Sequence, residues 1–189
     1  MTTLVDLADN SRTDKNTVHS YLPLYDSLFS RLCEKAVNVL EVGIYLGGSI
    51  KLWRDYFQNS TVYGLDIMPR SLIWPVLLDD SRIKIYDSTD AYNLDFFNRT
   101  FLSPGLKFDM MLDDGPHTLE SMKAFIELYS HLLTDDGILV VEDVQSWDWI
   151  AHLEAAVPPE LKQYIKTYDL RANKNRYDDI VFTIDKKLN

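Results

Sequence analysis

Five short, nearly continuous apolar runs, separated by segments with helical periodicity, constrain the fold of this chain more than any other feature. These predicted strands are residues 37–42, 61–65, 83–86, 108–112 and 138–141. Strands that are apolar throughout, rather than at alternate positions, are typical of a parallel sheet covered on both faces. The sequence therefore predicts an α/β fold with five parallel strands.

Helical patterns fill the intervals between these runs. The predicted helices are residues 49–57, 69–77, 91–98 and 119–133. The last has the clearest signals, because Thr118 can cap its N-terminus and its apolar residues recur on one face. The residues that follow, Thr134-Asp135-Asp136-Gly137, predict a turn into the fifth strand.

The pattern changes after the fifth run. Residues 147–156 predict a helix that ends before two prolines, and residues 164–170 and 179–184 predict an antiparallel β-hairpin. A basic cluster of Arg171, Lys174 and Arg176 falls between the two hairpin strands, where we expect a solvated tip. Before the first strand, residues 21–33 predict an extra helix. The predicted architecture is a Rossmann-like sheet with helices on both faces.

Composition excludes several classes of protein. The 189 residues suffice for one compact domain without disulfides, and the single cysteine, Cys33, has no internal partner. A formal net charge of −10 argues against a nucleic-acid substrate, because phosphate binding depends on clustered Lys and Arg. The sequence has neither a signal-peptide pattern at its start nor an apolar run of membrane-spanning length. We expect a cytoplasmic protein that binds neither nucleic acid nor membrane.

The first predicted strand ends in a glycine-bearing turn, Glu41-Val42-Gly43-Ile44-Tyr45-Leu46-Gly47-Gly48-Ser49, which leads directly into a helix. A dinucleotide fingerprint needs a second glycine two residues after Gly43, so that the backbone can cradle a pyrophosphate. Tyr45 occupies that position. The turn therefore favours a nucleoside cofactor that has no pyrophosphate.

Carboxylates end the next two predicted strands. Asp66, followed by Ile67, can accept hydrogen bonds from the two hydroxyls of a ribose. Asp87, followed by Ser88, can do the same for an adenine amino group. Each residue alone has a structural explanation as a turn or cap. Their order after three successive strands indicates a binding site.

This succession resembles the cofactor-binding pattern of class I S-adenosylmethionine-dependent methyltransferases. The resemblance implies that the first turn binds the methionine part of S-adenosylmethionine, Asp66 the ribose and Asp87 the adenine end. The implied cofactor-binding residues are Glu41, Gly43, Tyr45, Gly47, Ser49, Asp66, Ile67, Asp87, Ser88 and Asp113.

Acidic residues gather at the ends of the fourth and fifth strands, in Asp113-Asp114-Gly115-Pro116-His117 and Glu142-Asp143. Neighbouring carboxylates repel one another unless a cation lies among them, and oxygen ligands favour Mg²⁺ or Mn²⁺ over zinc. We expect Asp114, Glu142 and Asp143 to be metal ligands, with His117 as the base that deprotonates a hydroxyl. The alternative is a set of turn and cap residues with no metal.

These two segments closely resemble the metal-dependent sugar O-methyltransferases of macrolide biosynthesis. The resemblance implies that Asp114, Glu142 and Asp143 hold Mg²⁺ and that His117, with Asp114, is catalytic. Thr13-Asp14-Lys15, His19, Tyr21 and Tyr25 resemble the segment that precedes the core in those enzymes. We expect residues 1–35 to form a helical cap over the cofactor site and residues 36–189 to form the methyltransferase core of one globular domain. The chain departs from the family in its shorter length and in Pro116.

The predicted activity is methyl transfer to a sugar hydroxyl, and the family implies a deoxyhexose such as rhamnose, in a glycan or on a small molecule. Trp74, Trp147, Trp149 and Tyr45 are candidates for stacking on the sugar ring. Three alternatives remain open: a methyltransferase for catechol-like phenols, a Rossmann-type dehydrogenase, and a noncatalytic domain that binds a partner. The sequence also leaves open whether the chain forms a homodimer.

Overall fold

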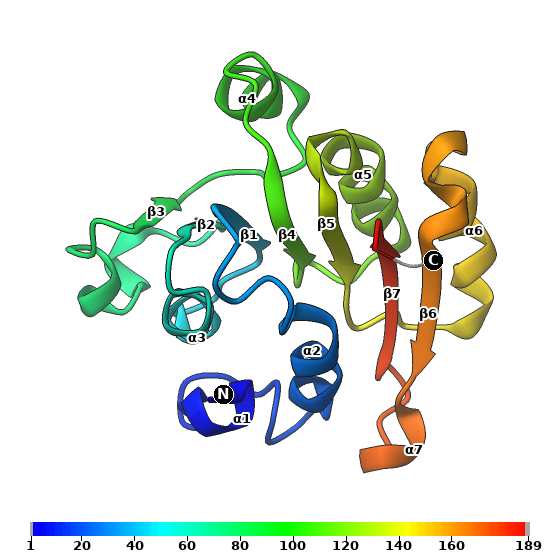
Figure 1. Ribbon diagram of the computed structural model, residues 1–189, viewed down its shortest axis with the longest axis horizontal. Coiled ribbons are helices and arrows are strands. Elements are labelled where there is room, and N and C mark those ends of the chain that lie inside the picture. The colour runs from blue at the N-terminus through cyan, green and yellow to red at the C-terminus, as the bar shows by residue number, and fades with distance from the viewer. Residues whose placement is uncertain (1, 188–189) are drawn as a thin grey trace.

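A computed structural model describes residues 2–187 as a seven-stranded mixed sheet between two layers of helices (Figure 1). The strands are β1 (Asn38–Val42), β2 (Thr61–Leu65), β3 (Ile83–Tyr86), β4 (Phe108–Asp113), β5 (Leu133–Val141), β6 (Ile165–Asp169) and β7 (Ile180–Asp185). The α-helices are α1 (Leu4–Leu7), α2 (Tyr21–Phe29), α3 (Gly48–Tyr56), α4 (Leu94–Phe97), α5 (Leu119–Tyr129), α6 (Ile150–Ala156) and α7 (Arg171–Lys174).

The strand order is β3-β2-β1-β4-β5-β7-β6. Strands β1 to β5 pair in parallel, and β7 pairs antiparallel with both β5 and β6. The parallel core and the C-terminal hairpin predicted from the sequence are both confirmed. Because the chain leaves β1 in one direction and resumes at β4 on its other side, the carboxyl ends of β1 and β4 form the point where ligands of such sheets bind.

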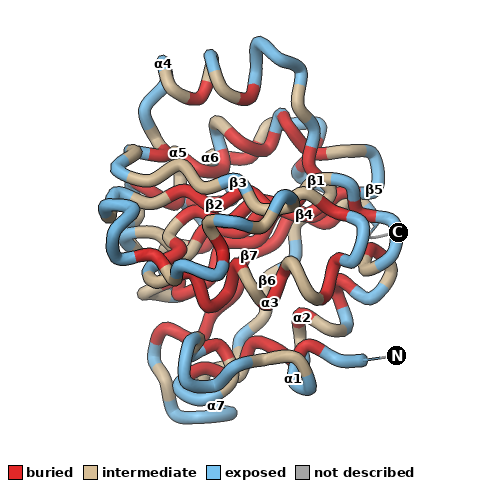
Figure 2. The backbone as a smooth tube through the Cα atoms, turned by 90° about the vertical axis from the view of Figure 1, so that its left-hand side faces the viewer, coloured by how far each residue is buried: buried red, intermediate tan, exposed pale blue. Residues whose placement is uncertain are grey.

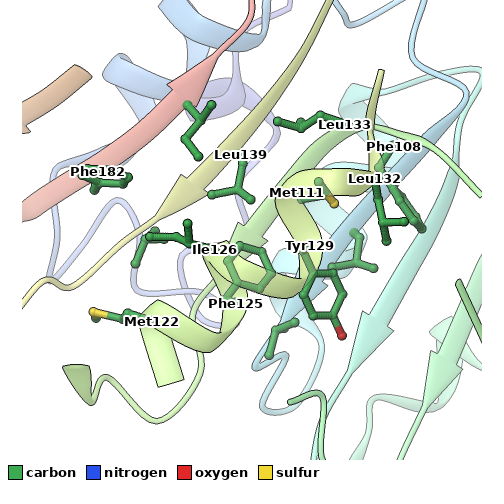
Figure 3. Close-up of a cluster of buried hydrophobic side chains, with 14 of the residues drawn as sticks. Phe108, Met111, Met122, Phe125, Ile126, Tyr129, Leu132, Leu133, Leu139 and Phe182 are labelled. Carbon is green, nitrogen blue, oxygen red and sulfur yellow. The ribbon is translucent and has the colours of Figure 1, made fainter. Parts of the chain in front are cut away.

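The central strands are largely apolar because each face of the sheet packs on its own hydrophobic cluster. Within β4, Met111 belongs to the cluster under α5, whereas its neighbour Met110 belongs to the cluster under α2 and α3. Figure 2 shows α4, α5 and α6 on one side of the sheet and α1, α2 and α3 on the other. Figure 3 shows Phe125, Ile126 and Tyr129 of α5 packed against the strands.

Two predicted helices differ from the structure. Residues 69–77 form two short 3₁₀ turns, Arg70–Leu72 and Pro75–Leu77, rather than one helix. Pro75 lacks an amide hydrogen and disfavours a helical residue before it, so a continuous helix cannot cross that position. The helix expected at residues 91–98 begins only at α4, where Asn93 caps it, and continues as the π-helix Asn98–Leu102.

The turn predicted after α5 was wrong. Residues 134–137 lie inside β5, which begins at Leu133, directly after a 3₁₀ turn at Ser130–Leu132. The β4–β5 register shifts between Phe108 and Met110, so a bulge takes up the residues that the sequence assigns to a turn. Thr134 Oγ1 donates a hydrogen bond to Asp109 Oδ1 at 3.0 Å and ties this bulge to β4.

The remaining elements follow the predictions closely. The helix expected at residues 147–156 is a 3₁₀ turn, Trp147–Trp149, followed by α6, and a further 3₁₀ segment, Pro159–Tyr164, leads into β6. The extra N-terminal helix is present as α2 but ends at Phe29. Within residues 2–187, no helix combines the length and apolar character needed to cross a membrane.

Candidate functional site

A cavity of about 830 Å³ opens at the carboxyl ends of β1, β2, β4 and β5. Of the residues predicted for the site, those that line the cavity are Gly43, Tyr45, Ser49, Asp66, Ile67, Asp114, His117 and Asp143. Those that lie behind or beside its wall are Glu41, Gly47, Asp87, Ser88, Asp113 and Glu142. A segment of the N-terminal region, residues 10–19, contributes most of its residues to the same wall.

The glycine turn after β1 is shaped by a close approach to the loop after β4. Gly43 has a φ of +80°, and a Cβ at this position would lie 1.9 Å from the carbonyl oxygen of Asp114. The Asp114 amide in turn donates to the Val42 carbonyl at 2.8 Å. Only glycine allows both this positive φ and this close approach to Asp114. The backbone geometry therefore confirms the glycine turn predicted from the sequence.

Asp66 fastens this turn to the end of β2. Its Oδ2 accepts hydrogen bonds from the amides of Ile44, at 2.9 Å, and Tyr45, at 2.8 Å, and its Oδ1 accepts one from Met68 at 2.9 Å. The side chains of Tyr45 and Ile67 remain largely exposed at the cavity mouth. Asp66 therefore lines the cavity while it also holds the turn in place.

Asp87 and Ser88 contribute nothing to the wall formed by the described residues. Asp87 accepts a hydrogen bond from the Arg70 amide at 3.3 Å and lies 3.6 Å from its guanidinium. The wall is formed instead by the following residues, 89–92. The sequence pattern indicates only the carboxylate that ends the strand, whereas the chain turns into the cavity two positions later, at residues without such a signal.

Asp113 ends β4 beneath the cavity and is buried. Tyr92 donates a hydrogen bond from its hydroxyl to Asp113 Oδ1 at 2.7 Å. Burial raises the pKa of Asp113 to about 7. The hydrogen bond from Tyr92 opposes this rise, and the neighbouring charge of Asp114 adds to it. Asp113 is thus a supporting residue for the wall, joined to Tyr92.

Asp114, His117 and Asp143 converge at one end of the cavity. His117 Nε2 lies 3.1 Å from Asp114 Oδ1 and 3.5 Å from Asp143 Oδ2. His117 and Asp143 both have a φ of +55°, a left-handed backbone that is rare outside glycine and is found at functional sites. Burial by itself lowers the pKa of His117, but its bond to Asp114 and the charges of Asp143 and Asp114 outweigh that effect and raise it.

Lys15 is the residue of this site that the sequence reasoning left without a role. Its ammonium lies 2.6 Å from Asp114 Oδ2, contacts Glu142 Oε1, and lies 3.5 Å from Glu41 Oε1. Burial raises the pKa of Asp114, but the Lys15 charge and the bonds from His117 and Lys15 outweigh it and lower the pKa to about 2. Asp114 is therefore ionised at neutral pH.

Tyrosines of α2 hold the acidic pair that follows β5. The Tyr21 hydroxyl donates to Asp143 Oδ1, and the Tyr25 hydroxyl donates to Glu142 Oε2. His19, just before this helix, has its Nδ1 2.7 Å from Asp179 Oδ1. The N-terminal residues singled out in the sequence thus contact the carboxylates directly, because α2 packs against the carboxyl end of β5.

Glu41 lies deeper, at the end of β1. Its Oε2 accepts hydrogen bonds from Ser49 Oγ at 2.6 Å and from Trp53 Nε1 at 3.0 Å. Burial raises its pKa to about 7, against the lowering effect of the Lys15 charge. Glu41 therefore anchors the start of α3 rather than the cavity surface.

The arrangement can hold a divalent cation. One ligand atom each from Asp114, His117 and Asp143 lies within 4.8 Å of the other two. The carboxylate oxygens of Asp114 and Asp143 suit Mg²⁺ or Mn²⁺, which retain water or substrate oxygens as further ligands. Glu142, the third predicted ligand, has its two oxygens in contact with Lys15 and Tyr25.

The aromatic candidates separate into two groups. Tyr45 lines the cavity, whereas Trp74, Trp147 and Trp149 are not among the described residues of its wall. Trp74 lies under the Arg12 guanidinium, with 4.4 Å between the guanidinium carbon and the ring centre. The tryptophans that follow the acidic pair therefore do not stack over this cavity in the structure.

The basic cluster of the hairpin is not simply solvated. Lys174 Nζ donates to the carbonyls of Asn16 and Thr17, the latter at 2.9 Å, and so joins α7 to the N-terminal segment. Arg176 pairs with Asp178 at 2.9 Å, and both line the cavity. Only Arg171, paired with Asp169 on the surface, fits the predicted solvated tip.

No family model matches the chain. Among curated proteins, it is 32% identical over 153 residues to mycinamicin VI 2''-O-methyltransferase from Micromonospora griseorubida, which covers 76% of this chain and 36% of the relative. It is 31% identical over 162 residues to 8-demethyl-8-alpha-L-rhamnosyl tetracenomycin-C 2'-O-methyltransferase from Streptomyces olivaceus, which covers 78% of this chain and 39% of that relative.

A solved structure shows the same fold. The MycE methyltransferase of the mycinamycin biosynthetic pathway, determined in complex with Mg, SAH and mycinamycin VI, matches 97% of this chain with a TM-score of 0.73 and 23% sequence identity. The chain covers 54% of that structure and 36 to 39% of the two curated relatives. The predicted methyltransferase fold and the resemblance to sugar O-methyltransferases are both confirmed.

Proposed function

Because the chain has the class I methyltransferase fold and is a homologue of sugar O-methyltransferases, we propose that it transfers a methyl group from S-adenosylmethionine to a sugar hydroxyl. The proposed acceptor is a deoxyhexose such as rhamnose, in a glycan or on a small molecule. The curated relatives modify sugars on macrolide and tetracenomycin compounds, which supports this acceptor class.

One observation carries the proposal. Asp114, His117 and Asp143 converge at one end of a cavity whose other walls include the glycine turn and Asp66. A volume of about 830 Å³ accommodates a nucleoside cofactor together with a sugar ring. This convergence supports a base and a cation site beside a cofactor-binding turn, as methyl transfer between two bound molecules requires.

His117 is the proposed base. The Asp114 carboxylate holds the imidazole through Nε2, and both residues line the cavity. A divalent cation bound by Asp114 and Asp143, with Glu142 nearby, would supply a positive charge that lowers the pKa of that hydroxyl. His117 then takes the hydroxyl proton as the acceptor oxygen attacks the sulfonium methyl group in line with the departing sulfur.

The end of the cavity that is proposed to bind the cofactor is formed largely by main-chain groups of the turn after β1. Gly43 and the Asp66-anchored turn present main-chain groups and the exposed side chains of Tyr45 and Ile67 to a bound nucleoside. Most of residues 10–19 line the cavity from the N-terminal side. We propose on this basis that residues 1–35 act as the cap and residues 36–189 as the methyltransferase core.

Calorimetric titration of metal-stripped protein with S-adenosylmethionine tests the cofactor assignment. Transfer of labelled methyl groups to methyl α-L-rhamnoside and to catechol, with Mg²⁺ or with a chelator, then tests the acceptor and the metal. We expect cofactor binding in the micromolar range and Mg²⁺-dependent methylation of the rhamnoside. Methylation of catechol alone would favour the phenol alternative, and binding of a nicotinamide cofactor in place of S-adenosylmethionine would overturn the proposal.

The assembly and the location of the protein extend this proposal. Action on a sugar of a biosynthetic product agrees with a cytoplasmic protein. Light scattering on the purified chain measures the oligomeric state, and fractionation of cells that express it measures the location.

A further inference from the structure

Lys15 lies among the acidic residues of three central strands. Its ammonium contacts Asp114 after β4 and Glu142 after β5, and lies 3.5 Å from Glu41 in β1. Its side chain is only 2% exposed. A buried ammonium retains its charge at such a place because carboxylates surround it, and the raised pKa of Lys15 agrees with these contacts despite the opposing effect of burial.

Lys15 also separates one predicted ligand from the cavity. Lys15, Asp114 and Asp143 line the cavity, whereas Glu142 is 1% exposed and is not among the described residues of its wall. Mg²⁺ binds oxygens at about 2.0–2.1 Å. A cation bound to both Asp114 and Glu142 would therefore need the space that the Lys15 ammonium fills between them.

We infer that Lys15 is an internal competitor of the divalent cation, and that cation binding moves its ammonium out from between Asp114 and Glu142. The inference rests on the proposed function, which assigns a cation to this site. It adds a residue that sets the affinity of the site, because an ion that binds both Asp114 and Glu142 must take the place of the positive charge held between them.

The same exchange links the cation to the N-terminal segment. Lys15 belongs to residues 10–19, most of which line the cavity and which other contacts also hold in place. The Arg12 carbonyl packs so closely on Gly48 that a Cβ there would lie 2.0 Å from it, and Lys174 holds the carbonyls of Asn16 and Thr17. Release of Lys15 therefore removes one of the contacts that hold this segment of the cavity wall, and the coupling acts in both directions.

Titration calorimetry with Mn²⁺ tests the competition. Lys15→Met keeps the length of the side chain and removes its charge, and Lys174→Met is the matched control because it loosens the same segment without touching an acid. We expect Lys15→Met to bind Mn²⁺ at least about tenfold more tightly than wild type, since a like charge close to the ion is gone, and Lys174→Met to bind it as wild type does. Unchanged or weaker binding by folded Lys15→Met would overturn the inference.

Amine acylation of the wild-type chain, read by mass spectrometry, avoids any folding defect of the variant. The Lys15 amine should react slowly in metal-stripped protein and several-fold faster with saturating Mn²⁺, while exposed Lys162 should react equally in both. Continued protection of Lys15 in Mn²⁺-loaded protein would contradict the exchange. Absence of Mn²⁺ binding by wild type and by Lys15→Met would overturn both this inference and the proposed metal site, while S-adenosylmethionine titration tests the methyltransferase assignment separately.

Discussion

His117 Nε2 lies 3.1 Å from Asp114 Oδ1. Within the described loop between β4 and α5, these two residues have titratable side chains, and both line the cavity. The Asp114 carboxylate fixes the orientation of the imidazole, and the left-handed backbone of His117 aims it at the same end of the cavity. The geometry of a base depends on such a partner.

Replacement of His117 by Asn tests this pair. Without a proton acceptor at this place, we expect the rate constant of methyl transfer to fall by about 10²- to 10⁴-fold, with S-adenosylmethionine affinity unchanged. Single-turnover kinetics and calorimetry measure the two quantities. His131→Asn, at an exposed position, serves as the control and should keep full activity. Full activity of the His117 variant would remove it from the mechanism.

Gly43→Ala should disrupt the cofactor turn. The new methyl group would meet the Asp114 carbonyl at 1.9 Å, and the φ of +80° would strain any side chain. We expect loss of measurable S-adenosylmethionine binding together with a lowered melting temperature. Gly105→Ala is the control, because its φ of +70° carries the same backbone strain with no atom within 4 Å of the new Cβ. Equal effects of the two variants would show that strain alone, not the close approach, matters at Gly43.

Asp66→Ala should weaken cofactor binding by at least about tenfold, since the cost of two lost charge-assisted hydrogen bonds exceeds 1.4 kcal/mol. The variant frees the amides of Ile44 and Tyr45, which Asp66 holds at 2.9 and 2.8 Å. Calorimetric titration with S-adenosylmethionine measures the effect, and Asp135→Ala, on a fully exposed side chain, is expected to bind as wild type. Wild-type affinity in Asp66→Ala would show that the turn keeps its shape unaided.

Asp113 should make stability depend on pH. Because burial raises its pKa from 3.8 to about 7, the folded chain binds one more proton than the unfolded chain between these values. The free energy of unfolding contributed by this group therefore falls as the pH rises from about 4 to about 7. Asp113→Asn removes this pH-dependent loss of stability. The free energy of unfolding of the variant, relative to that of wild type, should therefore increase between about pH 4 and about pH 7, by on the order of 2 to 4 kcal/mol.

Urea unfolding at pH 5 and pH 8 measures that difference for wild type and Asp113→Asn. Asp79→Asn is the control, because Asp79 is exposed and its substitution should leave the pH dependence unchanged. A stability difference between wild type and Asp113→Asn that stays constant with pH would mean that Asp113 is ionised in the folded protein throughout this range.

The local sequence predicted the elements whose residues all lie in the same kind of environment, such as strands buried on both faces of the sheet. Strands β1 to β4 and residues 138–141 of β5 are largely apolar because both sheet faces are covered, so their apolar runs located them in the sequence. The Gly43 turn and the strand-end carboxylates Asp66 and Asp114 were also predicted, because their spacing from the strands places them at one sheet edge. Residues 69–77 and 134–137 were assigned wrongly where prolines and a bulge override the local pattern.

The sequence by itself determined the sheet, the glycine turn after β1 and the acidic residues at the strand ends, because hydrophobic periodicity and backbone freedom are local properties. Only the tertiary structure decided which groups meet those acids. Lys15 is 99 positions from Asp114 and 127 from Glu142, and Asp179 is 160 positions from His19. These pairs form because the strand order brings the ends of β1, β4, β5 and β7 beside α2. The spacing of residues along the chain does not indicate that topology.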